Sequence, residues 1–164
     1  VSPLGGIVFE SDGSNLTAVW FPGQRDAAPD GERAELPVFS ATRRWLDVYF
    51  SGRDPGVTPP LAMKGSPFQC AVWELLKRIP YGATTTYGAL AKEIARSRGL
   101  PRMSAQAVGG AVGSNPIAIL VPCHRVLGAS GRLTGYAGGM DKKVRLLEFE
   151  GFRTTGDAPD SKVL

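Results

Sequence analysis

The stretch "SPFQCAVWELLKRIPYGATTTYGALAKEIARS", residues 66–97, decides how the longer part of this chain folds. Ser66 and Pro67 predict a helix start, because a serine side chain caps free backbone N–H groups and proline suits the first turn. Apolar side chains then recur at helical spacing on one face: Phe68, Val72, Leu75, Leu76 and Ile79. After "PYG", a second helix begins near Thr86. The sequence therefore predicts two consecutive amphipathic helices.

A third predicted helix, "MSAQAVGGAVGSN" (residues 103–115), follows the short connection "RGLPR" and consists mostly of small residues. Two short helices joined by a turn are typical of a helix-turn-helix. Each glycine inside a helix costs about 0.5–1 kcal/mol relative to alanine, so several glycines indicate that close approach outweighs helix stability. The partner is either the narrow minor groove of DNA or another helix of the same domain, and the sequence leaves both open.

Two further elements complete the C-terminal part. The stretch "GASGRLTGYAGG" (128–139) predicts a glycine-rich turn or wing. The stretch "DKKVRLLEFEG" (141–151) predicts a final helix that ends at Gly151. The apolar residues expected to face inward from it are Val144, Leu147 and Phe149.

The N-terminal part has a different pattern. The stretch "IVFESDGSNLTAVWF" (7–21) alternates apolar and polar residues and breaks at Asp12-Gly13, which predicts a hairpin of two strands. Residues 22–35 are polar and rich in turn formers, so we expect a loop there. The stretch "PVFSATRRWLDVYFSG" (37–52) predicts a helix with Gly52 as its stop.

The segment "RDPGVTPPLAMKGSP" (53–67) has four prolines and two glycines in fifteen residues and is the predicted domain boundary. We therefore predict a small α/β N-terminal domain over residues 1–60, made of a small antiparallel sheet and a helix. A mainly α, winged helix-turn-helix-like domain follows over residues 66–153, and a flexible tail over residues 154–164.

Composition narrows the class of protein. A chain of 164 residues that is 43% hydrophobic and 21% charged can bury a real core. No apolar run approaches about 18 residues, and the first residues resemble no secretory signal. We therefore expect no membrane partner and a location in the cytoplasm, with the nucleoid, or in the nucleus. We also expect a monomer.

Charge is unevenly distributed along the chain. Residues 1–65 have six Lys or Arg and eight Asp or Glu, a balance of −2, whereas residues 66–153 have twelve and five, a balance of +7. A basic half beside a slightly acidic half is a pattern expected of a nucleic-acid-binding protein. An ordinary solvated surface is the alternative.

Two cysteines and one histidine limit the metal and redox chemistry. Cys70 and Cys123 do not make a disulfide framework, and a single histidine leaves too few ligands for a typical four-ligand zinc site. We expect free thiols and no metal. Cys70 lies off the centre of the apolar stripe of its helix, so we interpret it as a packing residue.

Cys123 and His124 stand together in "ILVPCHRVLG" (119–128). A thiolate is a nucleophile, and imidazole is the side chain whose unperturbed pKa lies near neutrality. Adjacent side chains do not usually face each other, so we expect a water to bridge the two, with a carboxylate such as Glu150 orienting the far ring nitrogen. A structural cysteine–histidine pair is the alternative.

The surrounding motifs resemble a known family. "IPYG", "TYGALA", "AVGGA", "NPIAILVPCHRV", "GYAGG" and "LLEFEG" follow in this order within about residues 66–151. Together they resemble the O6-alkylguanine-DNA alkyltransferases, which take an alkyl group from a DNA base onto their own cysteine. "SPLGGIVF" and "WLDVYFSG" resemble, more loosely, the small N-terminal α/β domain of that family.

The resemblance implies catalytic roles for five residues. Cys123 would be the alkyl acceptor and His124 the general base acting through water, with Glu150 holding the imidazole. Asn115 would brace the active-site turn by hydrogen bonds. Tyr87 would help to swing the damaged nucleotide out of the helix and donate its hydroxyl to the leaving base.

The resemblance also implies the residues that contact substrate and DNA: Gln106, Ala107, Gly109, Arg125, Tyr136 and Gly138. Tyr136 and the following "AGG" would wall the base pocket, and Arg125 would have a structural hydrogen-bonding role. Gln106 is a departure, because many members have an arginine there that fills the stack after the base leaves. Arg96, Arg98 and Arg102 lie in a longer connection and would supply phosphate contacts.

The implied function is DNA repair. The alkyl group of O6-alkylguanine, and of O4-alkylthymine, would pass to Cys123 from double-stranded DNA bound through its minor groove. The thioether formed has no good leaving group, so each molecule would act once, without cofactor or metal. The alternatives are a cysteine hydrolase, an alkyl-lesion-binding sensor, and a helix-turn-helix regulator without efficient transfer.

Overall fold

The computed structural model describes residues 1–25, 31–155 and 158–159. Strands β1 (Val8–Ser11) and β2 (Leu16–Trp20) form an antiparallel hairpin. Asp12 shapes the turn, because its Oδ1 accepts hydrogen bonds from the backbone N–H groups of Ser14 and Asn15. The predicted hairpin is confirmed. Residues 26–30, in the middle of the loop expected over 22–35, lie outside the described residues.

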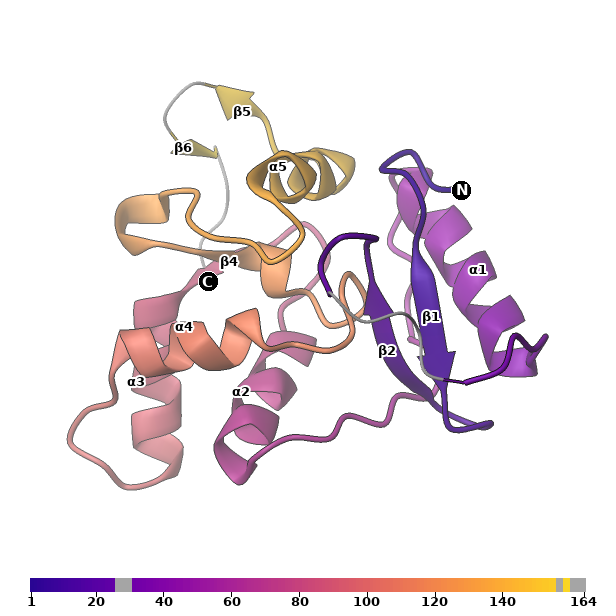
Figure 1. The fold of residues 1–164 in the computed structure, drawn as a ribbon. Coiled ribbons are helices and arrows are strands. Elements are labelled where there is room, and N and C mark those ends of the chain that lie inside the picture. Colours follow the sequence, from indigo (N-terminus) through magenta and orange to yellow (C-terminus); the bar gives the residue numbers. More distant parts are fainter. Residues whose placement is uncertain (26–30, 156–157, 160–164) are drawn as a thin grey trace.

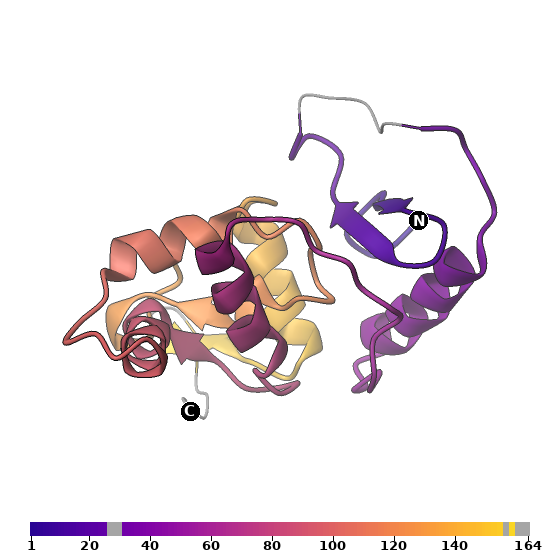
Figure 2. The same cartoon turned by 90° about the horizontal axis from the view of Figure 1, so that it is seen from below.

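Helix α1 (Pro37–Phe50) follows and ends before Gly52, whose φ of +77° favours glycine, as the sequence predicts. Its buried face consists of Val38, Thr42, Trp45, Leu46 and Tyr49. The hairpin and α1 lie on one side of the molecule, and the remaining helices lie on the other (Figures 1 and 2).

Three helices follow the proline-rich segment: α2 (Pro67–Lys77), α3 (Tyr87–Ser97) and α4 (Ala105–Gly113). Each begins where a hydroxyl side chain caps it, namely Ser66, Thr86 and Ser104, the first in a reciprocal capping box with Gln69. The predicted starts of α2 and α3 are confirmed, and α4 begins at Ala105, two residues after the start of the predicted stretch 103–115. The indole of Trp73 donates to the Ala111 carbonyl at 2.8 Å and ties α2 to α4.

Two very short strands were not predicted. Strand β3 (Thr85–Thr86) pairs in parallel with β4 (Val126–Leu127), so the segment after Cys123 lies beside the start of α3. Short 3₁₀ turns at Cys123–Arg125 and Ala129–Gly131 flank β4. Strands of two residues have no periodic pattern, which explains why the sequence does not reveal them.

The inward face of the last helix, α5 (Met140–Phe149), differs from the prediction. Leu147 is buried as expected, but Val144 and Phe149 are only partly buried, and Lys143 and Leu146 are buried in their place. Lys143 can be buried because its Nζ donates to the backbone carbonyls of Val126, Thr134 and Gly135 at 2.6, 2.7 and 3.3 Å.

The two halves of the chain share one hydrophobic core, to which both the hairpin and the helices contribute. Strand β2 also bonds the segment before Cys123. Val19 N donates to Pro116 O, and Ala118 N donates to Val19 O, both at 2.9 Å. The division into domains over residues 1–60 and 66–153 stays a prediction. Of the expected tail, the structure describes β5 (Thr154–Thr155) and β6 (Ala158–Pro159), an antiparallel pair; residues 156–157 and 160–164 lie outside it.

No helix in the described part of the chain is both long and apolar enough to span a membrane. Within the same residues, no three His, Cys, Asp or Glu side chains come together as a group that could hold a metal ion.

Candidate active site

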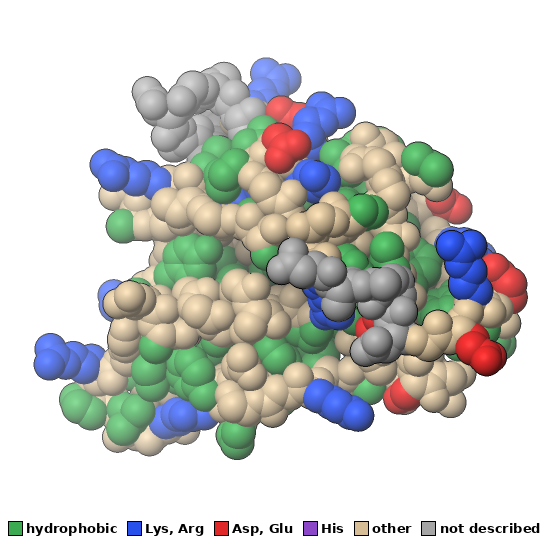
Figure 3. Space-filling view, in the orientation of Figure 1, with side chains coloured by type: hydrophobic (Ala, Val, Ile, Leu, Met, Phe, Trp, Pro, Cys, Tyr) green, Lys and Arg blue, Asp and Glu red, His purple; other side chains and the backbone are tan. Residues whose placement is uncertain are grey.

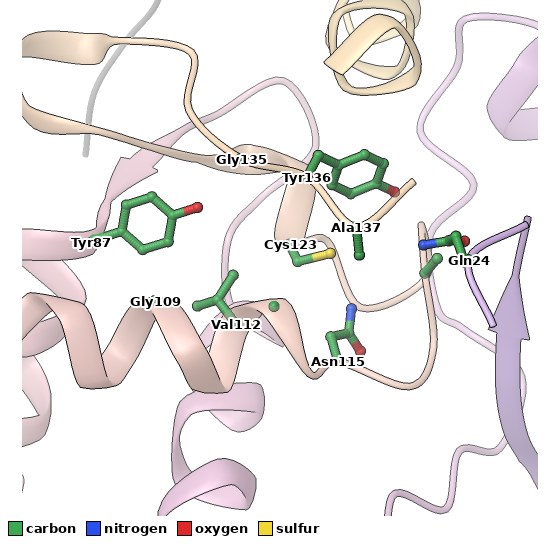
Figure 4. A pocket seen from close by; sticks show the side chains of 11 residues that line it. Gln24, Tyr87, Gly109, Val112, Asn115, Cys123, Gly135, Tyr136 and Ala137 are labelled. Carbon is green, nitrogen blue, oxygen red and sulfur yellow. The ribbon is translucent and has the colours of Figure 1, made fainter. Parts of the chain in front are cut away.

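A cavity of about 250 Å³ opens between α4, the start of α3 and the loop over residues 134–139 (Figure 4). Five of the residues singled out in the sequence line it: Tyr87, Gly109, Asn115, Cys123 and Tyr136. The Cys123 sulfur faces into the cavity, and Tyr87 and Tyr136 lie on either side of it. Gln24, from the segment after β2, closes the side nearest the hairpin.

Asn115 holds the segment that leads to Cys123. Its Nδ2 donates to Val121 O at 2.8 Å and to Ile117 O at 3.3 Å, and its Oδ1 accepts from Ile117 N at 3.0 Å. Between them lies Ile119, a buried β-branched residue with a φ of +70°, which is a strained conformation for such a side chain. The asparagine therefore helps to fix a tight turn, which the backbone bonds from Leu120 N to Ala118 O at 2.8 Å and from Val121 N to Ile117 O at 3.1 Å also close.

The Cys123 thiol is half-buried at the floor of the cavity. Desolvation by burial raises its pKa, and the Asn115 side chain and the positive charge of Lys143 oppose that rise. At neutral pH the resting group is therefore a thiol, and attack by its sulfur requires a base that accepts the proton.

His124 points away from solvent into a buried cluster of charged groups. Its Nε2 lies 2.6 Å from Glu150 Oε1. Arg125 grips the same carboxylate, with Nε 2.8 Å from Oε2 and Nη2 3.0 Å from Oε1, and its Nη1 donates to Ile79 O at 2.6 Å. Gly82 N adds a further hydrogen bond to Oε2 at 3.2 Å.

The charge state of this cluster follows from its contacts. Burial raises the pKa of Glu150, but the charges and hydrogen bonds of His124 and Arg125 outweigh it and bring the pKa down to about 2. Burial lowers the pKa of His124, although Glu150 acts in the opposite direction. The cluster at neutral pH is a carboxylate beside a neutral imidazole.

This charge state assigns the tautomer. A carboxylate can only accept, so the hydrogen of His124 sits on Nε2 and the lone pair on Nδ1. Nδ1 is buried and makes no hydrogen bond to any residue that the structure describes. A general base requires a free lone pair, which His124 has at Nδ1, and His124 directly follows Cys123 in the chain. The bridging water to Cys123 stays a prediction.

The remaining expected site residues, Gln106, Ala107, Arg125 and Gly138, do not line the cavity. Gln106 and Ala107 are exposed on the first turn of α4. Gly138 is restricted by space, because a Cβ there would lie 2.8 Å from Tyr136 Cε1. Arg125 is 7% exposed and bonds Glu150 and the Ile79 carbonyl. Its expected part in binding substrate or DNA stays a prediction.

Three residues that the sequence did not single out belong to the site: Gln24, Tyr49 and Lys143. The sequence contains a pattern that could have identified Lys143. Lys143, Leu146, Leu147 and Glu150 follow the spacing of one buried helix face, with a charged residue at each end. Gln24 and Tyr49 had none, since tertiary contacts alone bring them to the site.

Replacing Lys143 with methionine is expected to lower the free energy of unfolding by at least about 2 kcal/mol, because buried carbonyls lose a charged donor. Burial lowers the pKa of Lys143 to about 8, so the group is still mostly charged at neutral pH. Urea unfolding followed by tryptophan fluorescence measures the change. The control is Lys142→Met, which removes a cation 5.4 Å from the Phe21 ring and should cost under about 1 kcal/mol. Equal losses of unfolding free energy in both variants would show that the bonds from Lys143 to the buried carbonyls do not stabilise the fold.

Comparison with known proteins places this site in a family. Residues 67–152 match the family model described as "6-O-methylguanine DNA methyltransferase, DNA binding domain". A methylated-DNA–protein-cysteine methyltransferase of Methanosarcina acetivorans is 46% identical over 92% of this chain and 94% of its own length. One from Haemophilus influenzae is 41% identical over 91% and 82%.

A solved structure agrees with these relatives. OGT from Mycobacterium tuberculosis, crystallised in complex with DNA, superposes with a TM-score of 0.80 at 42% identity, over 91% of this chain and 88% of that one. The fold is thus that of the OGT structures, with a small antiparallel sheet and helices. The chain therefore belongs to the methylated-DNA–protein-cysteine methyltransferase family and is an enzyme of that class.

Proposed function

We propose that the protein repairs double-stranded DNA by moving the alkyl group of O6-alkylguanine onto Sγ of Cys123, once per molecule. The observation that carries the proposal is the position of the Cys123 thiol, which faces the cavity and directly precedes His124 in the chain, whose neutral imidazole is held by Glu150. The same displacement extends to O4-alkylthymine, because the reacting carbon is again bound to an exocyclic oxygen.

The proposed step balances as follows. The thiol proton passes through a water to His124 Nδ1, and Sγ attacks the alkyl carbon in line. The S–C bond forms as the C–O6 bond breaks, and the electron pair of that bond remains on the guanine. The base takes up a proton from the Tyr87 hydroxyl at the cavity wall, and the proton held by His124 then returns to the Tyr87 oxygen through water. Guanine and S-alkylcysteine are the products.

A base inside the duplex cannot reach this cavity, so the alkylated nucleotide must leave the stack. The cavity walls suit a nucleotide that has left the stack. Tyr136 lies over the cavity, and Gly138 lets the loop pack closely against the Tyr136 ring, because a Cβ there would clash with it. Gln106, exposed at the start of α4, is proposed to fill the gap left in the stack, where it can hydrogen-bond the orphaned base but adds no charge.

Helices α3 and α4 are proposed to act as a helix-turn-helix that docks α4 in the minor groove. Gly110 and Gly113 support this, because a Cβ at either position would meet nothing within 4 Å. At Gly109 a Cβ would be in ordinary contact with Tyr87, at 3.7 Å. Packing within the described residues therefore does not require these glycines, and an outside partner would explain them. On the side of α3 and α4 seen in Figure 3, Lys and Arg side chains are visible and acidic ones are not.

Gly110→Ala is expected to separate stability from DNA affinity. The substitution should raise the free energy of unfolding by about 0.5–1 kcal/mol, because alanine favours helices. The added methyl group on the docking face should weaken binding to a lesion duplex about tenfold, or about 1.4 kcal/mol. Fluorescence anisotropy with labelled duplex measures the affinity.

Gly88→Ala is the matched control, since its Cβ would lie 3.9 Å from Thr86 Oγ1, on α3 rather than α4. It should gain stability and keep its affinity. Unchanged DNA binding in Gly110→Ala would show that the small face of α4 does not dock on DNA.

The test of the proposed function is a transfer assay with a duplex that contains one O6-methylguanine, run with protein in excess (single turnover) for the rate and with duplex in excess for the stoichiometry. Guanine should be restored, and the reaction should stop at one methyl group per protein molecule. We propose that the protein acts as a monomer, in the cytoplasm or the nucleus. Tight binding without restored guanine would favour the lesion sensor. Many turnovers per molecule would contradict transfer to the protein.

A further inference from the structure

Tyr49, in the N-terminal helix α1, reaches the catalytic cluster of the C-terminal part. Its side chain is fully buried, and its hydroxyl lies 2.8 Å from Glu150 Oε1, 101 residues further along the chain. The same hydroxyl oxygen lies 3.2 Å from His124 Nε2 and 3.2 Å from Leu146 O. Thus one tyrosine oxygen contacts both members of the histidine–carboxylate pair.

The hydrogen of Tyr49 can be assigned from these distances. A phenol has one proton, and the shortest contact is to a charged oxygen, which makes the stronger bond. The hydroxyl therefore donates to Glu150, and its lone pairs are left to face the N–H of His124 Nε2. That N–H lies between two acceptors, Glu150 Oε1 at 2.6 Å and Tyr49 Oη at 3.2 Å. Both acceptors favour the tautomer with a free lone pair on Nδ1.

Packing prevents the tyrosine from turning away. Its ring stacks on Trp45 with centroids 5.7 Å apart and planes 8° apart, and meets the edges or faces of Phe50, Tyr81 and His124 at near right angles. Burial and the negative charge of Glu150 raise the pKa of the Tyr49 hydroxyl far above its ordinary value, so it keeps its proton as a donor.

We propose that Tyr49 is a positioning residue for alkyl transfer, which holds Glu150 and the imidazole of His124 in the tautomer that accepts the thiol proton. This rests on the proposed function of the site. A consequence is that α1 contributes to the chemistry, even though the motifs around Cys123 lie wholly within residues 66–151.

Tyr49→Phe tests the proposal, because it removes the hydroxyl and keeps the ring. The single-turnover transfer rate at neutral pH should fall about tenfold, as for other residues that orient a reacting group through a hydrogen bond. The affinity for the lesion duplex should not change, since Tyr49 is buried away from the cavity.

The pH profile separates positioning from packing. The groups around His124 are Glu150, Lys143, Arg125, Tyr49 and Cys123, and the variant keeps all but the Tyr49 hydroxyl. Without the Tyr49 hydroxyl as a donor, the negative charge of the Glu150 carboxylate is less stabilised and favours the protonated imidazole more strongly. The pKa of His124 therefore rises. The neutral base is then lost at a higher pH, and the acid limb of the rate profile should move to higher pH.

Tyr81→Phe is the matched control. Tyr81 belongs to the same aromatic cluster, but its hydroxyl donates only to a backbone carbonyl, Phe149 O, at 2.8 Å. It should lose stability without losing transfer rate. If Tyr49→Phe keeps the wild-type rate and pH profile while only its melting temperature falls, the residue is structural and the proposal is wrong.

A second measurement needs no variant and no activity. His124 is the only histidine, so its ring nitrogens give unambiguous ¹⁵N NMR signals in the wild-type protein. We expect a protonated Nε2 and an unprotonated Nδ1 at neutral pH. The opposite tautomer would overturn the proposal even if transfer occurs, whereas this tautomer in a protein that transfers nothing would refute the proposed function alone.

Discussion

Cys123→Ser should abolish alkyl transfer, with a loss of at least about 10³-fold, and leave the fold and lesion binding intact. Serine occupies nearly the same volume, but its hydroxyl is a far weaker acid and nucleophile than a thiol. The side chain is half-buried and braced by a turn that Asn115 holds through the backbone, so the substitution disturbs few contacts. Restored guanine, counted in the single-turnover assay, measures the loss.

The chain supplies its own control for this experiment. Cys70 is also half-buried and free, but its Sγ lies 3.6 Å from Gly65 O, outside the cavity. Cys70→Ser should transfer at the wild-type rate. Transfer that survives in Cys123→Ser and fails in Cys70→Ser would exclude the assigned acceptor.

Glu150→Gln should have the largest effect on stability. The carboxylate accepts from Arg125, His124, Tyr49 and Gly82, and glutamine leaves the buried guanidinium without its counter-ion. Breaking a buried ion pair by removing one partner costs about 3–5 kcal/mol of unfolding free energy. Transfer should fall as well, because a neutral amide no longer fixes the imidazole tautomer.

The acid dependence of stability reports the same carboxylate. Its pKa is about 2 in the folded protein against an ordinary value of 4.5. A lowered folded-state pKa adds stability that is fully present above the ordinary pKa and is lost as the pH falls towards the folded one. Stability should therefore drop between about pH 4.5 and about pH 2 in the wild type, and Glu150→Gln should show a smaller drop.

Urea unfolding at a series of pH values measures both effects. Glu148→Gln, at the same end of α5, is the control, because its ion pair with Arg145 at 2.8 Å is partly exposed and worth under about 1 kcal/mol. An equal cost in the two variants would contradict the buried cluster as a source of stability.

The sequence predicts the helices, and the residues that meet at the cavity, for local reasons. Ser66, Thr86 and Ser104 cap their helices through hydrogen bonds to residues three positions further along, so each helix start depends on a short stretch of sequence. Cys123 and Asn115 meet in one cavity because they belong to one continuous motif, and the predicted contact between Glu150 and His124 is present.

Tertiary structure decides the rest. The prediction that Val144 and Phe149 face inward from α5 was wrong. A prediction from apolar spacing places lysine on the outside, whereas Lys143 is buried among backbone carbonyls. Tyr49 reaches Glu150 across 101 residues, through packing of α1 that no local pattern encodes. Gln24 reaches the cavity only because β2 bonds the segment that precedes Cys123.

The most direct measurement is peptide mapping by mass spectrometry after the protein has reacted with a duplex that contains O6-methylguanine. We expect the mass of one added methylene unit on the peptide that contains Cys123, in step with restored guanine. A Cys123 peptide that stays unmodified while the lesion disappears, or a methyl group found on Cys70, would contradict transfer to Cys123.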